Sequence, residues 1–247
     1  MDIYNSILVA AKNQQKKGVF WEALLLFLVF FFPGYLYQST RFDFQVMYSP
    51  AFHISNLIFT LPQVLLLLYI LHLRTEGRLE KYGVHPFRLS LLPAALLSFL
   101  GILAITAMLS LTVQLIGSTA GVELTNPALP NMSGSQIDYS VLFKLPYIPI
   151  CILGTCLLTG YFEELYFRTY LLTEFADSPV GTAGIVLISS FLFAIGHLYQ
   201  GLIGFFGTFL LGTFLAYRYL RRRSWHEIAI AHGLYNFLMI MLIPAVH

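Results

Sequence analysis

The sequence predicts an all-α integral membrane protein, a bundle of about seven transmembrane helices with a polar cavity open to the cytoplasm. Composition is the first reason: of 247 residues, 57% are hydrophobic and only 11% are charged, and the mean hydropathy is +0.74. An ordinary soluble domain carries about 25% charged residues. The second reason is a series of apolar stretches, and the third is a small set of polar residues inside them that would be costly to expose to lipid.

Each apolar stretch is close to the length of about 20 residues that a spanning helix needs. The stretches are, in chain order, residues 20–37, 54–73, 89–117, 146–172, 180–199, 202–219 and 226–244. They take up most of the chain, so the sequence predicts a single polytopic membrane domain over residues 1–247. Only the letters LYQGLIG separate the fifth stretch from the sixth, so one of these two could be tilted or re-entrant.

Basic residues predict the orientation of these helices. Three groups lie on one side of the predicted membrane: Lys12, Lys16 and Lys17; Arg74, Arg78, Lys81 and Arg88; and Arg218, Arg221, Arg222 and Arg223. The other side has only Arg41 and Lys144. The positive-inside rule then predicts a cytoplasmic N-terminus and a C-terminus outside, in the plasma membrane of a prokaryote or the endoplasmic reticulum membrane of a eukaryote. The net charge of +2 is the sum of these loops and indicates no nucleic-acid partner.

Three charged residues, Glu163, Glu164 and Arg168, interrupt the fourth apolar stretch. Each would cost about 2.5 to 3.5 kcal/mol at the centre of a membrane helix, so they must be paired or have a function. Glu164 and Arg168 are four residues apart with the acid first, which is the favourable order for an ion pair on one helix face. Glu163 points about 100° away around the helix and has no partner on it. The alternative is that all three lie at the cytoplasmic interface with their charged ends in water.

Polar residues on the fifth and seventh stretches complete the pattern. The letters FLFAIGH place Phe193 and His197 four apart on one helix face, and HGLYN does the same for His232 and Asn236. A lone histidine in a helix is usually a core residue, but two histidines, an asparagine and Glu163 on three spans would be costly facing lipid. We therefore expect them to converge on one polar, hydrated pocket.

These residues carry a resemblance to a known family. EELYFR fits Glu-Glu-x-x-x-Arg, FAIGH fits Phe-x-x-x-His and HGLYN fits His-x-x-x-Asn, in this order on successive predicted helices. Together they resemble the CPBP family, also called Abi, which comprises CAAX prenyl endopeptidases and bacteriocin-processing or immunity-type intramembrane proteases. The resemblance covers about residues 150–244, and the N-terminal half is similar only in being hydrophobic. It implies a membrane-associated substrate in the lipid bilayer, either a lipidated (prenylated) protein or a leader peptide.

Peptide hydrolysis needs a base that activates water, groups that stabilise the oxyanion, and a proton donor for the leaving amine. Glu163 is the candidate base, while Arg168 would hold Glu164 ionised and fixed. His197 could orient the water together with Glu163.

The oxyanion would be stabilised by hydrogen bonds from His232 and Asn236, which are stacked one helical turn apart. The resemblance assigns the same catalytic roles to four residues: Glu163, His197, His232 and Asn236. The supporting residues of the same motifs are Glu164, Arg168 and Phe193.

Zinc-dependent hydrolysis is the alternative mechanism, with Glu163, His197 and His232 as protein ligands and a fourth position open. The pattern His-Glu-x-x-His is absent, and the resemblance implies catalysis by glutamate and histidine with no metal or other cofactor. Two further classes stay open. One is a non-catalytic binding or immunity-type membrane protein, and the other is a membrane carrier that binds metal or haem through His197 and His232.

The predicted depths of the two histidines conflict with a simple bundle. His197 lies 18 residues beyond Pro179, or about 27 Å along an ideal helix, whereas His232 lies only about 10 Å beyond Trp225. Strong tilt of the fifth helix, or a wide cavity open to the cytoplasm, would reconcile the two depths.

Overall fold

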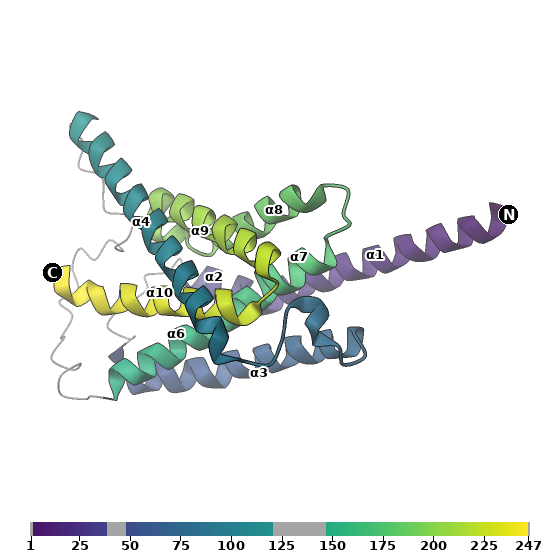
Figure 1. Ribbon diagram of the computed structural model, residues 1–247, viewed down its shortest axis with the longest axis horizontal. Coiled ribbons are helices and arrows are strands. Elements are labelled where there is room, and N and C mark those ends of the chain that lie inside the picture. Colours follow the sequence, from purple (N-terminus) through teal and green to yellow (C-terminus); the bar gives the residue numbers. More distant parts are fainter. Residues whose placement is uncertain (1, 39–47, 121–146, 247) are drawn as a thin grey trace.

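The structure, a computed structural model, describes residues 2–38, 48–120 and 147–246, and every regular element in these residues is a helix (Figure 1). Four stretches are long and apolar enough to cross a membrane: Pro50–Arg74, Leu89–Thr119, Ile148–Glu174 and Leu198–Arg222. The chain is therefore an all-α integral membrane protein, as predicted, and the number of seven spans stays a prediction. The long helices are α1 (Asp2–Phe30), α3 (Pro50–Arg74), α4 (Leu92–Ala120), α6 (Ile148–Glu164), α9 (Gly201–Arg222) and α10 (Trp225–Val246).

The first predicted span is two helices. Helix α1 begins at Asp2 and ends at Phe30, and after a turn at Phe31 the chain continues as α2 (Phe32–Gln38). Pro33 explains the break, because it has no amide hydrogen to donate and its ring would clash with the backbone carbonyl four residues earlier in a continuous helix. At this break Phe31 stacks on Phe162 of α6, and beyond it Tyr35 of α2 donates a hydrogen bond to the Leu192 carbonyl of α8.

The fifth predicted span is shorter than expected. Helix α8 (Gly181–Ile195) has 15 residues, and the chain leaves the helix at Gly196, before His197. A helix of this length falls short of the roughly 20 residues that cross a bilayer. His197 therefore lies just beyond the C-terminal end of α8 rather than on its face, as residues 180–199 had suggested.

The helix that carries the charged motif changes its winding where the motif lies. Helix α6 ends at Glu164, a π-helical segment η4 (Leu165–Tyr170) follows, and α7 (Leu171–Glu174) completes the rod. All six residues of η4 are buried. Single π-helical turns are rare and occur frequently at functional sites, because they re-aim the side chains around them.

Helix α10 packs along α6, and its first turn is anchored on two other helices. Ser224 is the N-cap, accepting a hydrogen bond from the Glu227 amide at 3.3 Å. The buried Glu227 carboxylate accepts hydrogen bonds from Ser98 of α4 at 2.8 Å, and from Arg218 at 2.6 Å and Arg222 at 2.9 Å on α9. The start of α10 is thus held in one position relative to α4 and α9.

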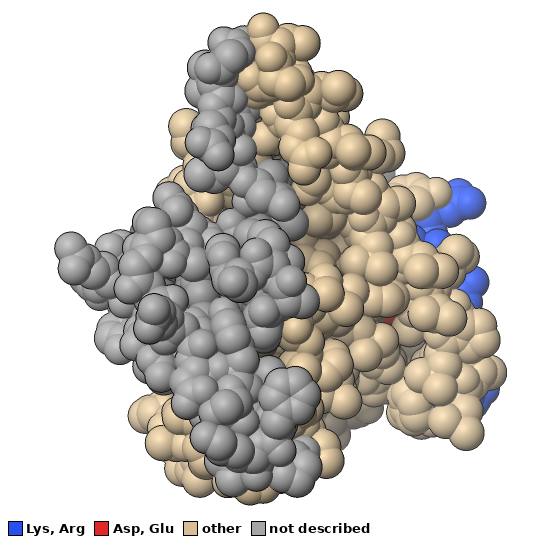
Figure 2. Space-filling view, turned by 90° about the vertical axis from the view of Figure 1, so that its left-hand side faces the viewer, with Lys and Arg blue, Asp and Glu red and all other residues tan. Residues whose placement is uncertain are grey.

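A second polar cluster ties the N-terminal helices to α7. Arg74, at the end of α3, lies 2.6 Å from Glu22 of α1 and 2.5 Å from Glu174 of α7. Tyr170 donates a hydrogen bond to Glu22 at 2.9 Å, and Tyr82 donates one to Glu174. Figure 2 shows a face on which Lys and Arg lie along one edge and the other described residues are almost free of charge, as expected for a protein surrounded by lipid.

Candidate active site

The predicted ion pair within the charged motif is present and fully buried. Arg168 Nη1 donates to Glu164 Oε1 at 3.0 Å, and both side chains are 0% exposed. The guanidinium carbon of Arg168 lies 4.2 Å from the centre of the Phe193 ring, which is a favourable cation–π distance. Gly212 of α9 makes room for this group, because a Cβ atom there would lie 2.8 Å from Arg168 Nη2. The pair is therefore enclosed by η4, α8 and α9.

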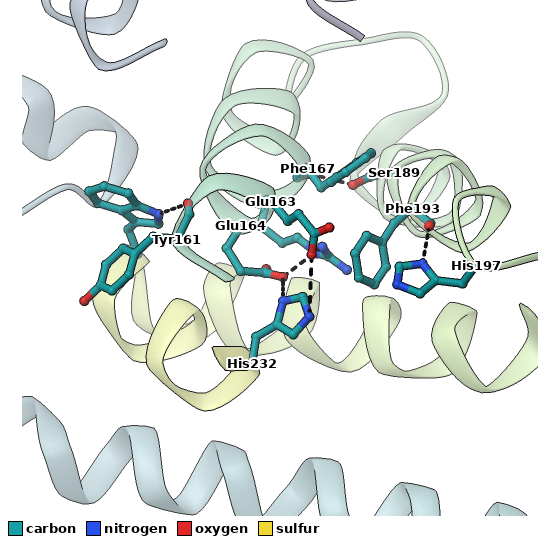
Figure 3. A network of polar contacts seen from close by, with 10 residues as sticks. Tyr161, Glu163, Glu164, Phe167, Ser189, Phe193, His197 and His232 are labelled. Carbon is teal, nitrogen blue, oxygen red and sulfur yellow. Dashed lines mark hydrogen bonds and ion pairs between the residues drawn. The ribbon is translucent and has the colours of Figure 1, made fainter. Parts of the chain in front are cut away.

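His232 of α10 joins the two glutamates (Figure 3). Its Nδ1 donates to Glu164 Oε1 at 2.8 Å, and its Nε2 lies 3.7 Å from Glu163 Oε2. Glu163, which has no partner on its own helix, thus finds one on α10. The two ring nitrogens thus face two different carboxylates, Nδ1 at hydrogen-bond distance from Glu164 and Nε2 at ion-pair distance from Glu163.

Phe193 lies between the two histidines. Its ring centre is 4.9 Å from that of His197 and 5.6 Å from that of His232, and it meets the latter edge to face (Figure 3). His197 Nδ1 donates to the Phe193 carbonyl at 3.1 Å. That bond selects the tautomer of a neutral His197 and leaves Nε2 with its lone pair available, which suits a group that accepts a hydrogen bond from water.

The structure brings the predicted residues together to different degrees. Glu163 and Glu164 both face His232, and Glu164 also pairs with Arg168. His197 lies against Phe193, whose ring also meets His232. Asn236 lies one turn beyond His232 on α10 and is partly buried, with no hydrogen bond to any residue that the structure describes. Among those residues, no group of three or more His, Cys, Asp or Glu side chains is arranged to hold a metal ion.

Several residues that position the site were not predicted from the sequence. Ser189 of α8 donates a hydrogen bond to the Phe167 carbonyl of η4 at 2.5 Å and so joins two helices. Serines in membrane helices more often bond a carbonyl of their own helix. Ser224 and Glu227 anchor α10, and their spacing ahead of an apolar run is a capping-box signal that was readable in the sequence. Tyr35 of α2 reaches α8, and no local pattern indicates such a contact.

Part of the chain is similar to a known protein family. Residues 145–238 match the family described as type II CAAX prenyl endopeptidase Rce1-like. This range contains all seven motif residues, whereas α1 to α4 lie outside it. Neither the curated proteins nor the solved structures gave a match. Residues 145–238 of the chain are therefore similar to the Rce1-like CAAX prenyl endopeptidases, and this range holds the motifs that resemble the CPBP family.

Proposed function

We propose that this protein is an intramembrane endopeptidase that hydrolyses a peptide bond of a lipidated or membrane-associated substrate. The similarity of residues 145–238 to type II CAAX prenyl endopeptidases supports the reaction class. The observation that carries the proposal is that two adjacent glutamates contact one histidine, and only one of them is neutralised by an arginine. Two carboxylates in such different environments are suited to two different roles.

Glu164 is the supporting carboxylate of the pair. Its Oε1 already accepts hydrogen bonds from Arg168 and His232, and the side chain is 0% exposed. Glu163 makes no contact with an arginine among the described residues, and 19% of its side chain is exposed. Glu163 is therefore the glutamate that a water molecule can reach, and it acts as the general base.

The proposed reaction proceeds in two steps. Glu163 takes a proton from water, whose oxygen attacks the carbonyl carbon of the scissile bond and forms a tetrahedral oxyanion. His232 Nε2–H and the Asn236 amide donate hydrogen bonds to that oxyanion. The carbon–nitrogen bond then breaks, and Glu163 returns its proton to the leaving amine, so that the base is regenerated.

His197 orients the attacking water in this proposal. The Nδ1–H group of His197 donates to the Phe193 carbonyl, so its Nε2 accepts a hydrogen bond from the water. This bond turns the free lone pair of the water oxygen toward the substrate carbonyl. Phe193 keeps the rings of His197 and His232 apart, which leaves one histidine on the water side and the other on the oxyanion side.

The proposed membrane arrangement has about seven spans, a cytoplasmic N-terminus, and a polar cavity that opens to the cytoplasm. The partial exposure of Glu163 supports access by water. The basic edge in Figure 2 supports a cytoplasmic side rich in Lys and Arg. We also propose that the reaction needs no metal, because Glu163 and His197 together activate the water directly.

Purified protein and a farnesylated peptide with a CAAX terminus test the function. We expect the wild type to release the C-terminal tripeptide and Glu163→Ala to be inactive while remaining folded. Glu80→Ala, which removes an exposed loop glutamate, is the matched control and should keep wild-type activity. A Glu163→Ala protein that still cleaves would contradict the mechanism. If the wild type leaves this peptide intact, mass spectrometry of peptides that accumulate in cells carrying Glu163→Ala identifies the alternative substrate.

A further inference from the structure

Tyr35 of α2 contacts the C-terminal end of α8. Its hydroxyl donates to the Leu192 carbonyl at 3.2 Å. Its ring lies directly on Gly196, where an added Cβ atom would be 2.5 Å from Tyr35 Cζ. Gly196 immediately precedes His197, so the contact is made at the residue from which His197 projects.

The end of a helix is where such a contact has most effect. The last four carbonyls of an α-helix lack intrahelical partners, and Leu192 is one of these in α8. Tyr35 supplies a donor to this carbonyl from another helix, while its ring covers the glycine at which the helix ends. Both contacts restrict the direction in which the chain leaves α8 and therefore the position of His197.

Tyr35 is itself held by aromatic packing against the glutamate-bearing helix. Its ring meets Phe27 edge to face at 5.7 Å and lies 6.5 Å from Phe31. Phe31 in turn stacks on Phe162 at 4.8 Å and contacts Phe167 at 4.7 Å. Phe162 is the residue before Glu163, so one aromatic cluster connects the backbone next to Glu163 with the backbone next to His197.

Tyr35 thus contacts the α8 end that presents His197 and, through Phe31, the rings of Phe162 and Phe167 beside the charged residues. It lies in α2, outside residues 145–238, so the similarity to a known family assigns it no role.

We propose that Tyr35 is a positioning residue of the active site, which holds the end of α8 so that His197 and Glu163 address the same water molecule. The inference rests on the proposed hydrolytic function. It extends the functional unit beyond residues 145–238 to the N-terminal helices, because Tyr35 lies in α2 and is held by Phe27 of α1 and by Phe31 between the two helices.

Substitution of Tyr35 tests the role of each contact. Tyr35→Phe removes only the hydroxyl, and we expect kcat for the farnesylated peptide to fall about 3- to 10-fold with KM unchanged. Tyr35→Ala also removes the ring, and we expect a fall of about 100-fold. The matched control is Tyr69→Phe, at an exposed tyrosine on α3, which should keep the wild-type kcat.

Gly196 provides a reciprocal test of the same contact. Gly196→Ala places a methyl group closer to Cε1 of the Tyr35 ring than two carbon atoms can approach. The ring or the end of α8 must therefore move, and we expect kcat to fall. Tyr35→Ala in the same protein removes the clash, so the double variant should be no less active than Tyr35→Ala alone. If the fold-loss of kcat in the double variant equals the product of the losses in the two single variants, the two residues do not act through one contact.

A readout without substrate separates this inference from the proposed function. Diethylpyrocarbonate modifies an available imidazole nitrogen, and peptide mass spectrometry gives its rate at His197. We expect several-fold faster modification of His197 in Tyr35→Phe and Tyr35→Ala, with an unchanged rate in Tyr69→Phe. Unchanged His197 reactivity in both variants overturns the positioning role, whereas an inactive wild type with the expected reactivity changes overturns only the proposed peptidase activity. Lower thermal stability with unchanged kcat and reactivity would mean that Tyr35 only packs, and would also overturn the inference.

Discussion

Gly160 of α6 and Gly233 of α10 meet backbone to backbone. A Cβ atom on Gly160 would lie 2.9 Å from the Gly233 nitrogen, and one on Gly233 would lie 2.8 Å from Leu157 Cα. Small residues allow this close approach of membrane helices. Because Gly233 follows His232 and Gly160 is three residues before Glu163, the contact sets how near the histidine comes to the two glutamates.

Alanine at either glycine should therefore separate α6 from α10. We expect Gly160→Ala and Gly233→Ala each to lower stability by about 1 to 3 kcal/mol and to reduce activity more than stability alone accounts for. Gly154→Ala on the same helix is the control, since nothing lies within 4 Å of a Cβ atom there. Thermal unfolding and turnover of the purified variants check this. Activity like that of the Gly154→Ala protein would show that the close approach does not position His232.

The two glutamates should respond differently to the loss of charge. Glu163→Gln removes the base, and we expect a fall in kcat of about 100-fold or more at nearly unchanged stability. Glu164→Gln should retain more activity, because the amide oxygen can still accept hydrogen bonds from Arg168 and His232. Turnover and thermal unfolding under one condition compare the variants. Equal losses of activity at unchanged stability would contradict the division of labour between the two carboxylates.

Arg168 should be required for stability as well as for rate. Arg168→Ala leaves Glu164 buried and unpaired by arginine, and we expect the stability to fall by about 3 to 5 kcal/mol. Arg168→Lys keeps the charge but loses the planar group that lies over Phe193, so it should be partly active. Chemical unfolding and turnover of both variants give the order. A lysine variant no better than the alanine variant would show that charge at this position is not sufficient for function.

Glu227 should affect the site from a distance. Glu227→Ala leaves Arg218 without its carboxylate partner and releases the first turn of α10, and we expect a loss of about 3 kcal/mol. His232 lies five residues further along α10, so kcat should fall as well. The exposed Glu76→Ala is the control for removal of a paired glutamate. Wild-type turnover in Glu227→Ala would mean that α10 is held in place without this anchor.

Removal of metal should leave the activity intact. If Glu163 and His197 activate an unligated water, exhaustive dialysis against a zinc chelator should not change turnover of the peptide. Metal analysis of the dialysed protein confirms that zinc is gone. Loss of activity that added zinc restores would favour the alternative in which Glu163, His197 and His232 are ligands.

The membrane class and the ion pair could be read from the sequence because they depend on local properties. Composition alone indicates a chain that lipid surrounds, and an acid four residues before a base on one helix predicts a pair at contact distance. The Glu164–Arg168 pair is present even though the turn between them is π-helical, because the shared helix keeps both groups close. His197, just beyond α8, and His232 and Asn236 on α10 were also identifiable, since polar groups in apolar stretches are costly unless they have partners.

The partners of these groups were decided only in the tertiary structure. The sequence predicted that Glu163 and His232 share a pocket, but not that they face each other directly, because that contact depends on two glycines that let α6 and α10 touch. Helical spacing equally gives no sign that α8 ends before His197 or that the Tyr35 ring lies on this end, since that contact joins residues of α2 and α8 that are far apart in the chain. Local patterns determine which side chains share one helix face. The distances between helices depend on side-chain volumes at contacts far apart in the chain, and these distances place the two glutamates and the two histidines around one site.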